Sequence, residues 1–459
     1  MSNATAHAAH IEGPSERGLS RRAVVRSAAG AAALAAAAPA LAACGPSAGG
    51  DGSGKTLIRF LYATGDATWN EVVAAVTEAF NAQSDTVVVE PEPLPASSDY
   101  ATALKTIDAT GNWPALVDMR DTLTYMDAGK IAPIPESVTS LLSDEVYAPA
   151  EDGEVYIVPS TALNGEIGFN IVYDKDYFEE HALAVPTTYA EFIALMDAIK
   201  ANGDVPLAMA AAEVWPSDQI WKPLAAPTFA QYTENGGYWN TVEAGEATVA
   251  DLRDPMERLK TITDEYALEG WQSTQDAQTS TLLINGQAIM ATSSAGLWRL
   301  NDIAKVDPEF NAGLFVIPAD DGTLNVLKNS VNGDTAAGIA ISTQAQEDGA
   351  QYDAAVEFLE FYYSVAACDL MEQTGVVSPN IKKSAEVTRN DSIPGAADYF
   401  SLLENPKLAW YANEPTNPNH STFNTFFRQS RIEMMDDQIT IDQLIEKSQE
   451  EFENLMAEG

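Results

Sequence analysis

From Thr56 onward, short apolar runs alternate with stretches of helical periodicity, and this alternation limits the chain to folds of the α/β class. Apolar runs at 57–62 and 87–90 predict strands, and the stretch between them predicts a helix at 68–81 with one apolar face. A chain of this kind folds as β-sheets flanked by helices.

The alternation continues toward the C-terminus, apart from one stretch. Further helices are predicted at 100–110, 188–202, 351–364 and 441–457, and further strands at 116–119, 156–159, 164–170, 206–210 and 337–342. The stretch 211–239 is rich in Trp, Pro and Tyr and has no clear periodicity, so it is predicted to be irregular. Large aromatic side chains on such segments either contact ligands or fill the core.

Length and charge narrow the class of protein. The 459 residues include 67 acidic and 25 basic side chains, which give a formal net charge of −42. Nucleic acid and anionic lipid headgroups are therefore poor partners. We interpret the acidic surface as a solubility device and infer no substrate from it. The length is too great for one compact core and predicts two lobes.

The N-terminal segment has the features of an export signal. A twin-arginine pair at 21–22 precedes an alanine-rich run at 28–40, and Cys44 follows small residues. This pattern is typical of a bacterial lipoprotein, so residues 1–43 are expected to be removed and Cys44 to carry a diacylglycerol at the outer face of the cell membrane. The alternative is a transmembrane anchor, but the run is short, weakly hydrophobic and interrupted by Pro39.

Residues 49–56 match the phosphate-loop pattern GxxxxGK(S/T) letter for letter. A phosphate loop needs a buried strand before it and a helix that begins at its Lys-Thr pair, so that backbone N–H groups converge on the phosphates. Here a lipid attachment site precedes the pattern and a predicted strand follows it. We therefore interpret residues 44–55 as a flexible linker between the anchor and the body.

The cysteine and histidine content excludes several chemistries. Besides Cys44 the chain has only Cys368, so no internal disulfide is expected. Once the leader is removed, only His181 and His420 remain, and neither lies in a metal-ligand spacing. No GxSxG turn is present. We expect no metal site, no cofactor and no catalytic triad.

Three blocks of sequence carry a resemblance to a known family. They are EIGFNIVYDKDYF at 166–178 with VPTTYAEF at 185–192, NGQAIM at 285–290 with GLW at 296–298, and GIAIS at 338–342 with GVVSP at 375–379. In order and spacing they resemble the extracellular solute-binding proteins of carbohydrate ABC importers, and together they cover most of the chain from Thr56 to its end. The chain departs from the family pattern at Phe169, where Tyr is usual, and at Ser378.

The resemblance implies a fold and a role. The fold is a type II, two-lobed, periplasmic-binding-protein-like α/β fold with three hinge crossings and a ligand cleft between the lobes. One lobe would combine 56–163 with 331–376, and the other would combine 164–330 with 377–459. The implied role is that of a monomer that captures a sugar or oligosaccharide and delivers it to the permease subunits of an ABC importer.

Polar candidates for the ligand site stand where predicted strands end and at the hinge. Carboxylates and amides form hydrogen bonds with sugar hydroxyls, and Asp66, Asp121, Asn164 and Glu166 occupy such positions. Asp66 and Asp121 could instead cap the helices that follow them, and Glu166 could form a salt bridge at the hinge. Asn332 is a further candidate.

Aromatic candidates would cover the C–H faces of a sugar ring. The resemblance implies that Trp298 contacts the sugar and that Trp410 lies on a segment lining the cleft. The irregular stretch adds Trp215, Trp221 and Trp239. Of these we favour Trp215. Trp69 is also a candidate, although its helix gives it a core alternative.

We predict a binding protein that carries out no chemistry and whose lobes close on the ligand. An anchored glycoside hydrolase would also use acidic pairs and aromatic side chains, but no acid and nucleophile pair can be picked out. The other alternative is a non-sugar solute. This solute could be a polyamine, a peptide or a phosphate ester. A polyamine would suit the carboxylates, whereas a phosphate ester would need basic side chains, which are scarce here.

Overall fold

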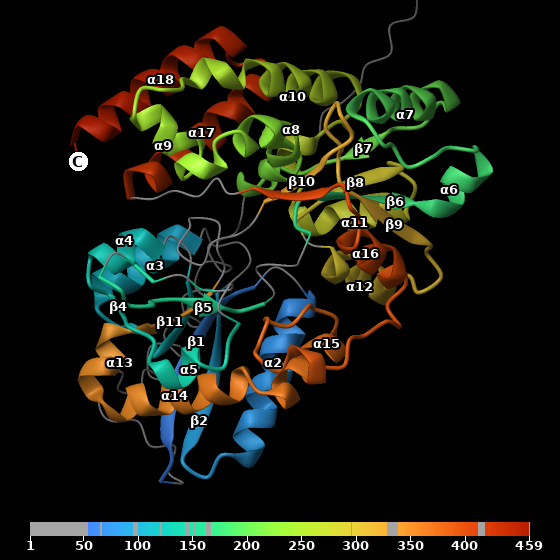
Figure 1. The fold of residues 1–459 in the computed structure, drawn as a ribbon. Helices are drawn as coiled ribbons and strands as arrows, with labels where there is room; N and C mark the ends of the chain where they lie inside the picture. The colour runs from blue at the N-terminus through green and yellow to red at the C-terminus, as the bar shows by residue number, and fades with distance from the viewer. Residues whose placement is uncertain are drawn as a thin grey trace, which may run out of the picture. The chain divides into compact units, whose positions relative to one another are not determined.

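The strands form two main β-sheets from different stretches of the chain, and Figure 1 shows the helices that flank them. The structure is a computed structural model in which Gly50–Gly459 group into one compact unit. It describes residues 54–64, 67–94, 100–119, 122–143, 147, 149–150, 152–161, 167–294, 296–327, 338–411 and 418–458.

The first sheet has six strands, in the order β2-β1-β3-β11-β4 with β5 paired to β11. They are β1 (Thr56–Ala63), β2 (Val87–Leu94), β3 (Leu116–Met119), β4 (Ile131–Ala132), β5 (Val158–Pro159) and β11 (Gly338–Ser342). Strand β1 is parallel to β2 and β3, whereas β11 is antiparallel to β3, β4 and β5. Ile339 and Ile341 of β11 are buried, so a late strand completes a core begun by early ones.

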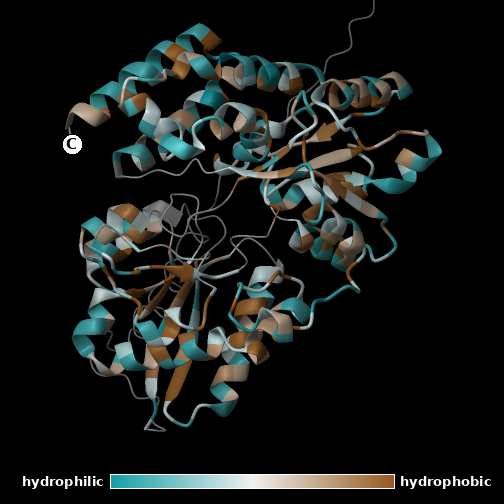
Figure 2. Ribbon diagram, in the orientation of Figure 1, coloured by the Kyte–Doolittle hydropathy of each residue, from teal (hydrophilic) through white to brown (hydrophobic). Residues whose placement is uncertain are grey.

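Helices from both stretches cover the first sheet. They are α2 (Ala67–Gln83), α3 (Tyr100–Thr110), α4 (Thr122–Asp127), α5 (Glu136–Thr139), α13 (Thr343–Asp348), α14 (Ala350–Tyr362) and α15 (Val365–Thr374). Phe80 of α2 and Phe358 of α14 share one apolar core with β1. The strands of this first sheet are largely brown, that is hydrophobic, in Figure 2. This core also includes Ile381, which forms an isolated antiparallel β-bridge with Leu142. It therefore extends past residue 376, the expected end of the lobe.

The second sheet has four strands in the order β7-β8-β6-β9. They are β6 (Asn170–Asp174), β7 (Leu207–Ala208), β8 (Met290–Ser293) and β9 (Ala312–Phe315). Strand β6 is antiparallel to β8 and β9, and β7 is parallel to β8. A separate parallel pair joins β10 (Leu324–Leu327) to β12 (Leu408–Tyr411).

The helices of this second part are numerous. They are α6 (Lys175–Glu180), α7 (Tyr189–Asn202), α8 (Asp218–Ala230), α9 (Tyr238–Glu243), α10 (Arg253–Glu265), α11 (Asp276–Ile284), α12 (Leu297–Val306), α16 (Ala396–Leu403), α17 (Pro418–Met435) and α18 (Ile441–Glu458). Short 3-10 helices are η2 (Trp215–Ser217), η3 (Thr233–Asn235), η4 (Val249–Leu252), η5 (Trp271–Ser273) and η6 (Ser384–Glu386). Trp239 of α9 packs on Phe423 of α17 and Phe452 of α18, which ties the C-terminal helices to this core.

The stretch 211–239 was predicted to be irregular, and that prediction was wrong. The structure places η2, α8, η3 and α9 there. Helix α8 contains Pro223 and Pro227, which remove backbone donors, and most of its residues are buried. A helix buried on nearly all sides has no polar stripe, so its sequence lacks the periodicity that reveals surface helices.

The strand predicted at 164–170 is also displaced. Residues 162–166 lie outside the described residues, and β6 begins at Asn170. Phe169 just before it has a φ of 55°, which extended backbone does not adopt. The other predicted elements, named above by their ranges, agree with the structure to within a few residues.

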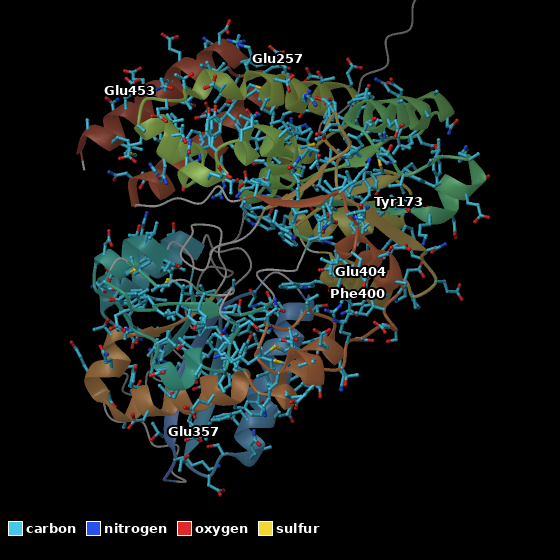
Figure 3. All side chains as sticks on the ribbon, viewed as in Figure 1. Tyr173, Glu257, Glu357, Phe400, Glu404 and Glu453 are labelled. Carbon is cyan, nitrogen blue, oxygen red and sulfur yellow. The ribbon has the colours of Figure 1, made fainter. Side chains whose placement is uncertain are left out.

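Two expectations about the surface and the linker can be compared with the structure. Thr56 begins strand β1 and no helix, so the phosphate-loop pattern lacks the helix that it needs. The Lys55 ammonium donates to the Ser84 carbonyl at 2.7 Å. The acidic excess lies partly on exposed side chains such as Glu257 and Glu453, which are labelled in Figure 3.

Candidate functional site

Five of the polar candidates lie outside the described residues. They are Asp66, Asp121, Asn164, Glu166 and Asn332. The lipidation candidate Cys44 lies outside them as well. The site is therefore described from its aromatic candidates and from the side chains that support them.

Two predicted aromatic residues, Trp69 and Trp298, lie against each other. Trp69 stands in the first turn of α2 and Trp298 in the first turn of α12. Their ring centroids are 5.9 Å apart and their planes are inclined by 42°. Trp69 is 4% exposed and belongs to the core of the first sheet, whereas Trp298 is half-buried. The pair thus joins a helix of the first sheet to a helix that packs with the second.

A hydrogen-bond network beside this pair joins the same two helices. The buried Thr68 hydroxyl donates to Asp302 at 2.5 Å and accepts from the Asn301 amide at 3.0 Å. It also accepts from the Lys305 ammonium at 2.9 Å, which donates to Glu71 at 2.6 Å as well. The first turn of α2 is therefore bonded to α12 at several points.

Trp215 and Trp410 differ from the other tryptophans in their exposure. Trp215 is 40% exposed at the start of η2, and Trp410 is 38% exposed on β12. Trp221 and Trp239, which the sequence left open as alternatives to Trp215, are only 2% and 3% exposed and lie in the second core. Among these three, the favoured residue is the one at the surface.

A buried ion cluster lies directly after the segment that carries Trp215. The Asp218 carboxylate accepts from Arg428 at 2.7 Å and also pairs with Arg431, whose guanidinium lies 4.5 Å from the Trp221 ring centroid. Burial alone would raise the pKa of Asp218, but the charges of Arg428, Arg431 and Lys222 outweigh it and hold that pKa well below its usual range. The cluster fastens α17 to α8.

A second buried polar network lies next to Trp298. The Arg299 guanidinium donates to Asp276 at 2.7 Å, and the Gln219 amide donates to the other oxygen of that carboxylate at 2.6 Å. Gln219 in turn accepts from the Thr292 hydroxyl at 2.8 Å. Arg299 is 4% exposed. The network joins α8, α11, β8 and α12 by hydrogen bonds, and α12 is the helix that carries Trp298.

Sequence reasoning missed both of these clusters. Their members come from helices that are distant in the sequence, and no local spacing brings Asp218 to Arg431 or Asp276 to Arg299. Basic side chains are scarce in the sequence, and their positions along it do not reveal these ion pairs. One signal was available in the helix 418–435, which carries Arg428 and Arg431. An arginine on the apolar face of a helix needs a buried acidic partner elsewhere in the chain.

Metal and membrane features were also sought within the described ranges. No group of three or more His, Cys, Asp or Glu side chains there is placed to hold a metal ion. Of the helices that the structure describes, none combines the length and apolar character needed to cross a bilayer.

Sequence comparison gives two matches. The model of one family, described as bacterial extracellular solute-binding protein, matches residues 75–396. A multiple sugar-binding protein of Streptococcus mutans serotype c is 26% identical over 219 residues, which are 46% of this chain. The match spans 50% of the length of that relative.

Structure comparison gives likenesses along nearly the whole body. A chitin oligosaccharide binding protein has a TM-score of 0.71 and 17% identity, over 88% of this chain and 99% of that one. A sugar transporter protein of Bacillus licheniformis in complex with stachyose has a TM-score of 0.65 and 16% identity, over 87% of this chain and 100% of that one. These likenesses show that the chain has the α/β fold of those proteins, consistent with the type II periplasmic-binding fold.

Proposed function

This chain belongs to the family of bacterial extracellular solute-binding proteins, and from this we propose that it captures a sugar or oligosaccharide and delivers it to the permease of an ABC importer. Similar proteins bind chitin oligosaccharide or are in complex with stachyose, and one is named a multiple sugar-binding protein. Delivery to a permease follows from the transport role of such relatives.

One observation carries the proposal. Of the eight tryptophans, Trp215, Trp298 and Trp410 are the three that are not buried, and these are the residues favoured as sugar contacts. The buried ones are Trp69, Trp113, Trp221, Trp239 and Trp271. An indole face at the surface can cover the C–H face of a sugar ring, and this packing removes apolar surface of both from water. Trp69 would support Trp298 from behind.

The proposed mechanism is lobe closure without catalysis. The lobes would be 56–163 with 331–376 and 164–330 with 377–459. The separate first and second sheets support this division, but the place of Ile381 in the first core extends that lobe past residue 376. Two of the three proposed hinge crossings fall at 162–166 and 328–337, outside the described residues. Asp66, Asp121, Asn164, Glu166 and Asn332 would supply hydrogen bonds to the sugar hydroxyls.

The location is the outer face of the cell membrane. We place the mature chain there as a monomer held by a lipid on Cys44, with residues 44–55 as the linker. Tethering would keep the loaded protein near the permease and raise its effective concentration there.

A thermal-shift screen tests the proposed ligand class. Galactose, stachyose, a chitin tetrasaccharide, a polyamine and a dipeptide are each added to the purified protein. A ligand that binds the native state raises the melting temperature as its concentration exceeds its dissociation constant. A shift with sugars alone, accompanied by a smaller radius of gyration in small-angle scattering, supports the proposal. A shift with the polyamine or dipeptide alone overturns the sugar class.

A further inference from the structure

The backbone makes an unusual turn just before Trp215. Val214 has φ of 68° and ψ of −55°. The Trp215 N–H donates to the Glu213 carbonyl at 2.8 Å, which closes a three-residue γ-turn. A γ-turn with positive φ is the rare and strained kind, and a β-branched residue pays the largest steric penalty there. Strain of this size persists only where the surroundings hold the turn in place.

Hydrogen bonds on both sides hold this turn. The Val214 N–H donates to the Ala211 carbonyl at 2.9 Å. The Glu213 carboxylate accepts from the backbone N–H of Asp276 at 3.3 Å, and the Asp276 carboxylate is itself fixed by Arg299 and Gln219. The turn is therefore bonded to the buried network that also fixes the residue after Trp298.

The two residues that flank Val214 have complementary chemistry. Glu213 is exposed, and Trp215 is 40% exposed. A carboxylate accepts short hydrogen bonds from hydroxyl groups, and an indole ring covers an apolar C–H face. A pyranose ring presents both kinds of surface, hydroxyls at its rim and C–H groups on its face.

We propose that Glu213 and Trp215 form a subsite for one pyranose ring of a neutral sugar, with the strained turn at Val214 holding the carboxylate and the indole in fixed relation. Glu213 accepts hydrogen bonds from ring hydroxyls, and Trp215 packs on the ring face. This inference rests on the proposed function and adds to it a polar contact that the sequence did not single out.

Glu213 lies beside a second carboxylate, that of Asp276. Partial burial raises the pKa of Glu213, backbone hydrogen bonds that include the one from Asp276 oppose this in part, and the charge of the Asp276 carboxylate raises it further. The Arg299 guanidinium pairs with Asp276 at 2.7 Å and so limits the repulsion between the two carboxylates.

Isothermal titration of the full-length protein tests the subsite. The probe is whichever of galactose, stachyose and a chitin tetrasaccharide binds the native protein most tightly. Glu213→Gln removes a charged acceptor and should weaken binding by about 10- to 100-fold. Trp215→Ala should weaken it by at least about 10-fold, whereas Trp215→Phe keeps an aromatic face and should restore most of the loss. The melting temperatures should stay close to native.

The matched control is Glu191→Gln on α7. Glu191 also accepts a backbone N–H, from Thr187 at 2.8 Å, and its replacement should leave the dissociation constant unchanged. Val214→Gly separates positioning from folding, because glycine adopts positive φ without strain but loosens the turn. It should weaken binding by about 3- to 10-fold with little change in melting temperature.

The outcomes separate the subsite from the proposed function. If the native protein binds a sugar and Glu213→Gln and Trp215→Ala bind it equally well, the subsite is wrong and the proposed function stands. If Val214→Gly binds as the native protein does, the turn has no positioning role and the proposal fails in that part. If the native protein binds none of the three sugars, both inferences fall together.

Discussion

Glu372 is a carboxylic acid buried at the end of α15, where the chain leaves the first core. It is 3% exposed, and one of its oxygens accepts from the backbone N–H and the hydroxyl of Ser378 at 2.8 and 2.9 Å. Its other oxygen is buried, and the backbone of Asn390 lies close enough to the carboxyl group to lower its pKa slightly. Burial raises the pKa of Glu372, and the bonds from Ser378 and the charge of Arg389 oppose this only in part. Ionisation of Glu372 is therefore shifted to higher pH in the folded protein.

The pH dependence of a Glu372→Gln variant tests that statement. Because the pKa is raised above the ordinary value of about 4.3, Glu372 favours the folded state most below about pH 4 and loses this contribution as pH rises through the raised pKa. Glutamine cannot ionise. The melting temperature of the variant, relative to native, should therefore rise between about pH 4 and pH 8 in calorimetry.

The same substitution at Glu191 should show the opposite trend. Hydrogen bonds from the Thr187 hydroxyl and backbone lower the pKa of Glu191, so its carboxylate contributes above the ordinary pKa and is lost as pH falls. The melting temperature of Glu191→Gln, relative to that of the native protein, should therefore fall as pH rises. Parallel curves for the two variants would contradict both assignments.

Among the elements, α2 and α12 are joined most directly by a single hydroxyl. Thr68 bonds to Asp302, Asn301 and Lys305, and the Trp69–Trp298 contact lies beside it. The hydroxyl both donates and accepts at this point, which an apolar side chain of the same shape cannot do.

Replacing Thr68 by valine keeps the shape of the side chain and removes the hydroxyl. The partners on α12 then lose a buried bond, so the free energy of unfolding should fall by about 1–3 kcal/mol. Urea unfolding followed by circular dichroism measures the change. Thr106→Val is the control, because the exposed Thr106 hydroxyl bonds only to a carbonyl of its own helix and its loss should cost less than about 0.5 kcal/mol. If the two variants lower the free energy of unfolding equally, the Thr68 hydroxyl does not stabilise the contact between α2 and α12.

The elements also show how far the sequence could predict the molecule. Helix α2 could be placed from its apolar face, and strand β3 from a short, mostly apolar run that is buried along its whole length. Helix α8 was not predicted, because it contains two prolines and is buried on nearly all sides, so its sequence shows no helical periodicity. Sequence reasoning favoured Trp215 but could not establish that Trp221 is buried, because its burial depends on packing against Phe427 of α17, which lies far along the chain. The γ-turn at Val214 has no glycine or asparagine to reveal it.

At the scale of the whole molecule, one residue near the N-terminus is expected to decide where the protein resides. If Cys44 carries the lipid, the body has no other attachment to the membrane in our proposal, and its net charge of −42 offers no attraction to anionic headgroups.

Cys44→Ala should therefore move the protein from the membrane fraction to the medium or the soluble fraction. Detergent phase separation followed by immunoblotting measures the shift. Cys368→Ala is the matched control, since it removes the other cysteine but leaves the attachment site, and it should stay with the membrane. Retention of Cys44→Ala in the membrane fraction would argue for a different anchor.

The burial of Cys368 has a practical consequence. Its side chain is completely shielded from solvent, and burial raises the pKa of its thiol to about 12, so the reactive thiolate is scarce at neutral pH. In a soluble form lacking Cys44, a cysteine introduced beside Trp215 would be the only one that a maleimide dye can reach. Cys368 can therefore be kept in such a form, and the dye would report binding of the proposed sugar ligand without interference from this thiol.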